Sequence, residues 1–214
     1  MQDTGKCIPS EVSGYSSLRN GRSEVALQAF ELSLTDSRML ELVERYGRLS
    51  TTTPSAFAVL VRSVISQQIS TKAADTIRER LRSRTGIEPY AVSQLCLSEL
   101  RGIGLSLGKA ECLRELSDLA LREDFNRFDD LSDDEVTKRL MAVRGIGPWT
   151  VQMFLIFGLR RADVWPITDL GLRSAIRNIY HIRSDTGYLR LGSRFRPFRS
   201  YAARYLWKSL ENTM

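Results

Sequence analysis

The stretch Leu140-Met-Ala-Val-Arg-Gly-Ile-Gly-Pro-Trp-Thr-Val-Gln152 contains the most informative turn of the chain. A helical segment ends, a Gly-Ile-Gly turn follows, and Pro148 stands where a new helix accepts proline. The glycines let the backbone approach a ligand closely, and the second helix begins with free N–H groups at the positive end of its dipole. This pattern is typical of a helix–hairpin–helix that binds nucleic-acid backbone irrespective of sequence. A lone Gly-x-Gly is more often only a tight turn between two helices, so the flanking sequence must distinguish that turn from a phosphate-binding hairpin.

Apolar residues recur at helical spacing on both sides of this turn, and no useful segment alternates with period two. Ser132-Asp-Asp-Glu135 is a capping box, which predicts the start of the helix that stops at Gly145. The sequence therefore predicts an all-α fold. The other expected helices cover residues 57–65, 71–84, 93–100, 109–121, 148–159, 169–180 and 198–210.

Composition places the chain among ordinary globular proteins. It has 214 residues, 43% hydrophobic and 26% charged, enough for one domain or two small lobes. No apolar run approaches the roughly 18 residues of a membrane span, and we find no signal-peptide stretch. We therefore expect a cytoplasmic protein (the nucleoid in a bacterium, the nucleus in a eukaryote). Residues 1–24 are polar and rich in Ser and Gly, and we expect a flexible lead-in there.

The chain is basic, and arginine dominates its positive charge. Net charge is +6 with a pI near 9.5, and only five of the 31 basic side chains are Lys. Arginine suits bidentate phosphate contacts, which favours a polyanionic partner. Codon bias in a GC-rich genome explains the same excess, so charge permits nucleic-acid binding without requiring it.

Residues that usually hold metals or form nucleophilic triads are scarce. Cys7, Cys96 and Cys112 are widely spaced with no C-x-x-C, which argues against a zinc ribbon, a disulfide framework or an iron–sulfur cluster. His181 is the only histidine and lies near an expected helix end. If the protein is an enzyme, we expect carboxylates to act, with no cofactor.

Two further segments have more than one interpretation. Asp169 lies at an expected helix N-terminus, where it can be an N-cap, a functional carboxylate or both. The segment Leu100-Arg-Gly-Ile-Gly-Leu-Ser-Leu-Gly-Lys-Ala110 repeats the Gly-Ile-Gly turn. It can form a second phosphate contact, but we favour a structural turn.

Together these residues resemble a known family. Val143-Arg-Gly-Ile-Gly-Pro-Trp-Thr150, followed by Asp169, is similar to the helix–hairpin–helix–Gly/Pro–Asp DNA glycosylases. Val64-Ile-Ser-Gln-Gln-Ile-Ser70 and Arg196-Pro-Phe-Arg-Ser-Tyr-Ala202 with Trp207 resemble the 3-methyladenine DNA glycosylase II (AlkA-like) branch. The resemblance covers roughly residues 25–211 and rests on four motifs in order.

The resemblance implies a two-lobed helical bundle with the active site in a cleft between the lobes. Residues 25–214 would form this domain, with residues 60–165 as a central lobe and the terminal segments as the other. It also implies hydrolysis of the N-glycosidic bond of alkylated purines such as 3-methyladenine and 7-methylguanine in damaged duplex DNA, after base flipping. The protein would act in base excision repair as a monomer with no obligate protein partner.

The resemblance also assigns roles to individual residues. Asp169 would be the catalytic carboxylate that stabilises charge on the sugar. Gln68, or its neighbour Gln67, would be the wedge that fills the space left by the flipped base. The base pocket would be lined by Trp149, Met153, Leu170 and Trp207; the two tryptophans are otherwise core residues. Phosphate would be bound by Arg144, Gly145, Gly147 and Thr150. No metal is certain, although a monovalent cation on the hairpin backbone (142–147) is common in the family.

Departures from the family pattern refine this hypothesis. Relatives that also nick the strand carry Lys at the position of Trp149, so we expect a monofunctional enzyme with no Schiff-base step. Thr168 replaces a second acid of some relatives, and Met153 replaces a pocket aromatic, which leaves the range of accepted bases open. Two alternatives remain: a glycosylase for a deaminated, oxidised or mismatched base, and a non-catalytic helix–hairpin–helix DNA-binding module.

Overall fold

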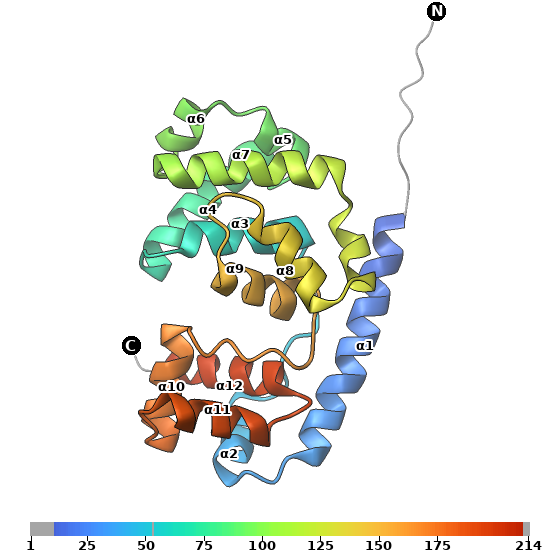
Figure 1. Cartoon of the computed structure of the whole chain (residues 1–214), viewed down its shortest axis with the longest axis vertical. Coiled ribbons are helices and arrows are strands. Elements are labelled where there is room, and N and C mark those ends of the chain that lie inside the picture. The colour runs from blue at the N-terminus through green and yellow to red at the C-terminus, as the bar shows by residue number, and fades with distance from the viewer. Residues whose placement is uncertain (1–10, 53, 212–214) are drawn as a thin grey trace, which may run out of the picture.

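The computed structural model describes residues 11–52 and 54–211, and these contain helices and no strand. The predicted all-α fold is confirmed. No helix in these residues is both long and apolar enough to cross a membrane. The buried apolar residues form two clusters, one within residues 56–164 and one made by residues 27–49 and 165–206. We call these parts the central lobe and the terminal lobe (Figure 1).

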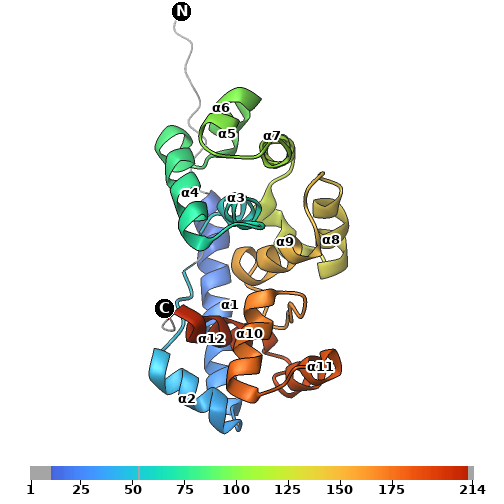
Figure 2. The ribbon, with the colours of Figure 1, turned by 90° about the vertical axis from the view of Figure 1, so that its left-hand side faces the viewer.

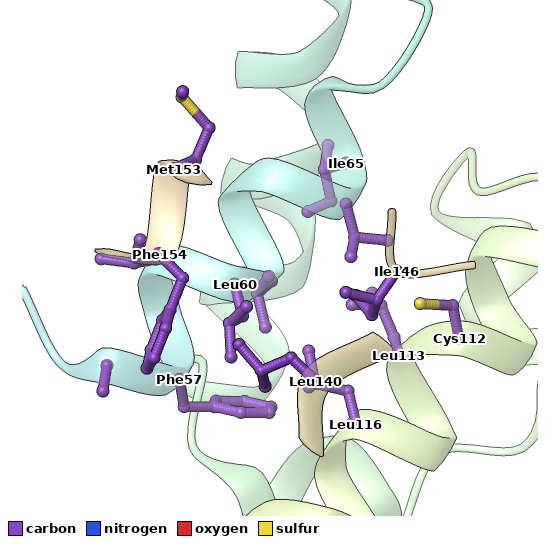
Figure 3. Close-up of a cluster of buried hydrophobic side chains, with 14 of the residues drawn as sticks. Phe57, Leu60, Ile65, Cys112, Leu113, Leu116, Leu140, Ile146, Met153 and Phe154 are labelled. Carbon is purple, nitrogen blue, oxygen red and sulfur yellow. The ribbon is translucent and has the colours of Figure 1, made fainter. Parts of the chain in front are cut away.

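The central lobe is built around α3 (Ala56–Ser66), which is apolar on most of its faces and buries eight of its residues. Such a helix is stable only when other helices cover it. The whole buried cluster takes side chains from all the other elements of the lobe. Those elements are α4 (Thr71–Thr85), α5 (Pro89–Ser93), α6 (Leu97–Gly102), α7 (Leu107–Arg122), the 3₁₀ turn η1 (Phe125–Asp130), α8 (Asp133–Met141), α9 (Pro148–Met153) and the π-helical turn η2 (Phe154–Gly158). Figure 3 shows Phe57, Leu60 and Ile65 of α3 clustered with labelled side chains of α7, α8, α9 and the turn after α9.

The terminal lobe joins helices from both ends of the chain. It contains α1 (Glu11–Ser33), α2 (Ser37–Tyr46), α10 (Leu170–Tyr180), α11 (Asp185–Arg194) and α12 (Arg199–Glu211). Helix α1 runs along both lobes in the two perpendicular views (Figures 1 and 2). Leu27 and Phe30 enter the core of the terminal lobe, whereas Arg19 donates to Asp129 and to the carbonyl of Gly158 in the central lobe. Helix α1 therefore ties the two lobes together.

Two expectations about local structure are corrected. The flexible lead-in was expected over residues 1–24; residues 1–10 lie outside the described residues, but 11–24 are helical, and Arg19 and Ser23 are buried. This part of α1 was missed because it contacts the central lobe through the polar side chain of Arg19, which gives no apolar pattern in the sequence. The expected helix over 93–100 is also wrong: α5 ends at Ser93, and α6 begins at Leu97. The backbone N–H of Cys96 donates to the Glu99 side chain at 2.8 Å, which starts a new helix.

Most of the caps read from the sequence are present. Ser70 begins α4, Ser132 begins α8 with the expected capping box, and Asp169 begins α10. Because these caps fix where helices begin, they also fix the loops between α3 and α4 and before α9 and α10. Those loops carry most of the candidate site.

Candidate active site

Asp169 is the N-cap of α10, and three donors hold its carboxylate. Oδ1 accepts from the backbone N–H of Leu172 at 2.6 Å and from the indole N–H of Trp207 at 2.8 Å. Oδ2 accepts from the indole N–H of Trp149 at 2.8 Å. Capping and a functional role were both open for this residue, and a cap alone needs only the Leu172 contact. The two indole contacts add an orientation that capping does not require.

The three side chains come from both lobes. Trp149 lies on α9 and packs on the central core, whereas Asp169 lies on α10 of the terminal lobe. Trp207, on α12, contacts both cores. In both views α9 and the start of α10 face each other across the boundary between the lobes (Figures 1 and 2). The carboxylate therefore lies at the junction of the lobes, where the family resemblance places the site.

The hydrogen bonds leave Asp169 with room for one more donor. A carboxylate accepts about four hydrogen bonds, two at each oxygen. Two positions at Oδ1 and one at Oδ2 are used by the contacts described above. The fourth position, on Oδ2, is what a water molecule would need in order to be oriented by this group. The arrangement can hold a fixed negative charge beside a developing cation and bind one water at the same time.

The expected pocket residues lie on the same elements as Trp149, Asp169 and Trp207. One face of Trp207 packs on Phe157 (ring centroids 5.7 Å apart), so only its other face is left for a ligand. Met153 is nearly buried in the central core, and Leu170, 79% exposed, begins α10. The four expected pocket residues thus come from α9, α10 and α12.

Two residues were missed in the sequence: Phe157, which packs on Trp207, and Gly171, two residues after Asp169. Phe157 follows Trp149 by two helical turns and lies in the π-helical turn, a distortion that is frequent at functional sites. Gly171 packs closely on the site, since a Cβ there would lie 3.1 Å from Asp169 Oδ1, a tight contact, and 3.5 Å from the Trp207 ring, an ordinary one. The glycine two residues after Asp169 was the available signal in the sequence.

The two hairpin glycines are required for different reasons. Gly145 has φ +93°, and a Cβ there would lie 3.2 Å from the Cβ of buried Cys112. Gly147 has ordinary extended angles (φ −108°, ψ 175°) and open space within 4 Å of a built Cβ. Within the part of the chain that the structure describes, neither glycine N–H donates a hydrogen bond. The fold requires a glycine at 145, whereas the space at Gly147 is free for an approaching ligand.

The neighbours of the glycines have partners of their own. The backbone N–H of Arg144 donates to Glu115 at 3.2 Å, and its side chain, 86% exposed, lies 3.8 Å from the Glu111 carboxylate, so it would have to leave that ion pair to bind phosphate. The hydroxyl of Thr150 accepts from Gln67 and is buried, which leaves its first-turn N–H. Burial, and then the charge of Glu115, raise the pKa of the Cys112 thiol to about 12, so this side chain stays neutral below the hairpin.

The hairpin backbone of residues 142–147, where a monovalent cation was an open possibility, has carbonyl oxygens that already accept hydrogen bonds. The carbonyl of Val143 accepts from Ile146 N at 3.1 Å, and the carbonyl of Gly145 accepts from Gln67 Nε2 at 3.2 Å. With Gly147 O, which accepts from Val151 N at 3.1 Å, three carbonyl oxygens of residues 142–147 already accept a hydrogen bond, and no step proposed below uses a cation. The described residues contain no cluster of three His, Cys, Asp or Glu side chains that could hold a metal ion.

The turn between α3 and α4 separates the two wedge candidates. The side chain of Gln67 donates to Gly145 O at 3.2 Å and to Thr150 Oγ1 at 2.9 Å, so it is bound to the hairpin. Gln68 is exposed and has φ +58°, a left-handed conformation that costs a non-glycine residue about 1 kcal/mol or more. The geometry favours Gln68 over Gln67 as a side chain presented to a ligand.

A depression elsewhere on the surface does not belong to this site. It has a volume of about 400 Å³, lies beyond the C-terminal end of α10, and is formed largely by α11 and the preceding loop. Its lining includes His181, Arg183 and Arg190. His181 caps the end of α10, which places it a whole helix away from Asp169.

Comparisons with known proteins agree with this geometry. Residues 61–196 match the family model described as HhH-GPD superfamily base excision DNA repair protein. The protein YfjP of Bacillus subtilis is 30% identical over 171 residues; the match covers 73% of this chain and 60% of that protein. DNA-3-methyladenine glycosylase 1 of Schizosaccharomyces pombe is 32% identical over 186 residues, with 80% of each chain covered.

A solved structure is similar over almost its whole length. The 3-methyladenine DNA glycosylase of Schizosaccharomyces pombe, in complex with abasic DNA, superposes with a TM-score of 0.75 at 30% identity. The match covers 90% of this chain and 98% of that one. The family match ends at residue 196, so it includes Asp169 and the hairpin but not Trp207.

Proposed function

The chain belongs to the HhH-GPD superfamily of base excision DNA repair proteins, and from this premise we propose that it is a monofunctional DNA glycosylase that releases alkylated purines from duplex DNA. The observation that carries the proposal is the carboxylate of Asp169, held between the indole N–H groups of Trp149 and Trp207 where the lobes meet. The names of the relatives in Schizosaccharomyces pombe support the substrate class.

Asp169 would act on the sugar. When the bond between C1′ and the purine N9 breaks, its electron pair leaves with the base and positive charge develops on the sugar ring. A fixed carboxylate beside C1′ stabilises that charge. Water held at the remaining acceptor position of Oδ2 then adds to C1′ and gives its proton to Asp169 or to solvent. The products are the free base and an abasic site.

The leaving group explains why no acid is needed on the base. A purine alkylated at N3 or N7 carries a positive charge and departs as a neutral molecule. The electron-rich rings of Trp149 and Trp207 would attract that cation by about 1–2 kcal/mol in a desolvated pocket. Met153 and Leu170 would complete the walls. Since Trp149 occupies the position where strand-nicking relatives carry Lys, no amine is present there to attack C1′.

The central lobe would bind the DNA. The N–H groups of Gly145, Gly147 and Thr150 would contact one phosphate, with the Arg144 side chain beside them. Gln68 would enter the duplex where the base has left. We propose damaged double-stranded DNA as the partner and a monomer as the active form. The protein would act in the nucleoid of a bacterium or the nucleus of a eukaryote.

Base release from methylated duplex DNA tests the proposal. We expect free 3-methyladenine and 7-methylguanine to appear with the wild-type protein and not with buffer alone. Release only from duplexes containing uracil or 8-oxoguanine would instead indicate a glycosylase for another lesion. Tight binding to abasic DNA with no release from any substrate would indicate the DNA-binding module.

A further inference from the structure

The turn that presents Gln68, residues 66–70, is held by a side chain from another helix. The ammonium group of Lys109, in the first turn of α7, donates to Ile65 O at 2.8 Å and to Gln67 O at 2.6 Å. These carbonyls belong to the end of α3, where the last C=O groups have no partner within the helix. A cation at this end also complements the helix dipole.

Two further contacts fix the same turn. The side chain of Gln67 ties it to Gly145 O and Thr150 Oγ1 of the hairpin, and Ser70 caps α4 by accepting from Ala73 N. The turn is therefore anchored to α7, to the hairpin and to α4. Its one left-handed non-glycine residue, Gln68, lies between these anchors with an exposed side chain.

Lys109 differs from a fully solvated surface lysine, because its ammonium group contacts two backbone carbonyls and its side chain is partly buried. This burial lowers the pKa of the ammonium group below its ordinary value. It comes from the segment 100–110 that repeats the Gly-Ile-Gly turn of the hairpin. That segment starts α7 with Ser106 as its N-cap, so it serves the structure, and through Lys109 it reaches the turn of residues 66–70.

We propose that Lys109 is a positioning residue for base flipping: by binding the carbonyls of Ile65 and Gln67, it holds Gln68 in the orientation that enters the DNA. The proposal rests on the proposed function. Lys109 would touch neither the base nor the sugar, and its whole effect would pass through Gln68. In this arrangement the hairpin would bind a phosphate, and the Gln67 side chain links the hairpin to the turn of residues 66–70. Lys109 holds the same turn from α7 through its carbonyls.

A double-mutant cycle separates this role from a general structural one. We expect Lys109→Met and Gln68→Ala each to slow single-turnover release of 7-methylguanine about 10-fold, with the melting temperature recorded for each variant. If Lys109 acts through Gln68, the double variant is no more than about twofold slower than Gln68→Ala alone. Losses that multiply to about 100-fold, or a Lys109→Met rate equal to wild type, would overturn the proposal.

Two further variants serve as controls. Lys208→Met removes the same charge from a lysine that also donates to a carbonyl, Tyr46 O at 3.3 Å, but in the terminal lobe. Its release rate should stay within about twofold of wild type, and an equal loss there would assign the Lys109 effect to charge alone. Lys109→Arg keeps a donor in reach of the turn and should restore most of the rate.

A fluorescence measurement keeps the test independent of catalysis. A duplex with an abasic analogue next to 2-aminopurine reports unstacking when a side chain enters the gap. At saturating protein we expect wild type to change the fluorescence, and Lys109→Met and Gln68→Ala to lose most of that change. If wild type releases no base but gives this signal and Lys109→Met loses it, the proposed function fails and the positioning role stands. A full signal from Lys109→Met refutes the positioning role.

Discussion

Replacing each hairpin glycine by alanine should separate folding from DNA binding. At Gly147 the added methyl group meets no protein atom within 4 Å, and the backbone angles suit any residue. Alanine is a poorer N-cap than glycine, but it lowers the entropy of the unfolded chain by about 0.4–1 kcal/mol. These effects oppose each other, so the free energy of unfolding of Gly147→Ala should stay within about 1 kcal/mol of wild type.

Gly145→Ala should destabilise the protein instead. A residue with a side chain at φ +93° is strained by roughly 1–2 kcal/mol, and the new Cβ lies 3.2 Å from Cys112 Cβ in a packed core. We expect a total cost of about 1–3 kcal/mol. In a chain of this size each kcal/mol lowers the melting temperature by roughly 2–4 °C. Thermal unfolding of the two variants side by side measures the difference.

DNA binding should respond to Gly147→Ala although stability does not. A hydrogen bond to a charged group contributes about 1.5–3 kcal/mol, so losing the phosphate contact should weaken binding about 10- to 100-fold. The slope of log Kd against log salt should stay close to that of wild type, because the lost donor is an uncharged amide and neutralises no phosphate. Anisotropy titrations with a labelled abasic duplex at several salt concentrations give both quantities. A folded Gly147→Ala with wild-type affinity would refute the phosphate site at the hairpin.

Three further predictions concern other parts of the molecule. Arg19→Met should lower the free energy of unfolding by about 3–5 kcal/mol, because it leaves the buried Asp129 carboxylate with only Arg22, among the described residues, as an ion-pair partner. Arg22→Met, which removes a side chain that is 66% exposed, should cost under about 1 kcal/mol. Chemical denaturation measures both costs, and equal costs would contradict the role of α1 in tying the lobes together. A thiol reagent should label Cys96 in the native protein and Cys112 only after unfolding, because Cys112 is buried and its thiol pKa is raised to about 12. Peptide mass mapping identifies the labelled cysteine. Fast labelling of Cys112 in the native protein would contradict its burial in the core. Borohydride should trap no covalent complex with abasic DNA, and a trapped adduct would argue for a lyase.

The central lobe was largely predictable because its signals are local. The apolar spacing of residues 57–65, the caps at Ser70 and Ser132, and the glycines of the hairpin each act within one or two helical turns. The expected lobe boundaries, residues 60 and 165, lie within a few residues of the division between the two buried clusters.

Helices held by distant contacts were not predictable. Helix α1 shows little amphipathic pattern, and its buried Arg19 pairs with a residue 110 positions away. Helices α2 and α11 were also missed, although Asp36 and Ser184 cap their first turns and Gly47 ends α2, because each has only ten residues. What the sequence does not show is the ion pair of Asp36 with Arg194 across the lobe. A single sequence carries no local signal for such pairs.

The family resemblance, and not spacing alone, made Asp169, Trp149 and Trp207 candidates for the site. Their contacts could not be predicted, because the two indole N–H groups point at the carboxylate only where the two lobes meet. The contacts of Phe157 with Trp207 and of Lys109 with Gln67 O are also tertiary, and no local signal in the sequence predicts them.

Release of 7-methylguanine by Asp169→Asn beside wild type, with affinity for abasic DNA measured in parallel, tests the central claim most directly. Asparagine keeps the cap of α10 and removes the charge. Its amide would face the N–H of Trp149, at a cost of about 1–3 kcal/mol, so the melting temperature is recorded to show that the variant is folded. We predict that release falls by about 100-fold or more while the Kd stays within about threefold of wild type. A folded variant that still releases the base at the wild-type rate would contradict the account.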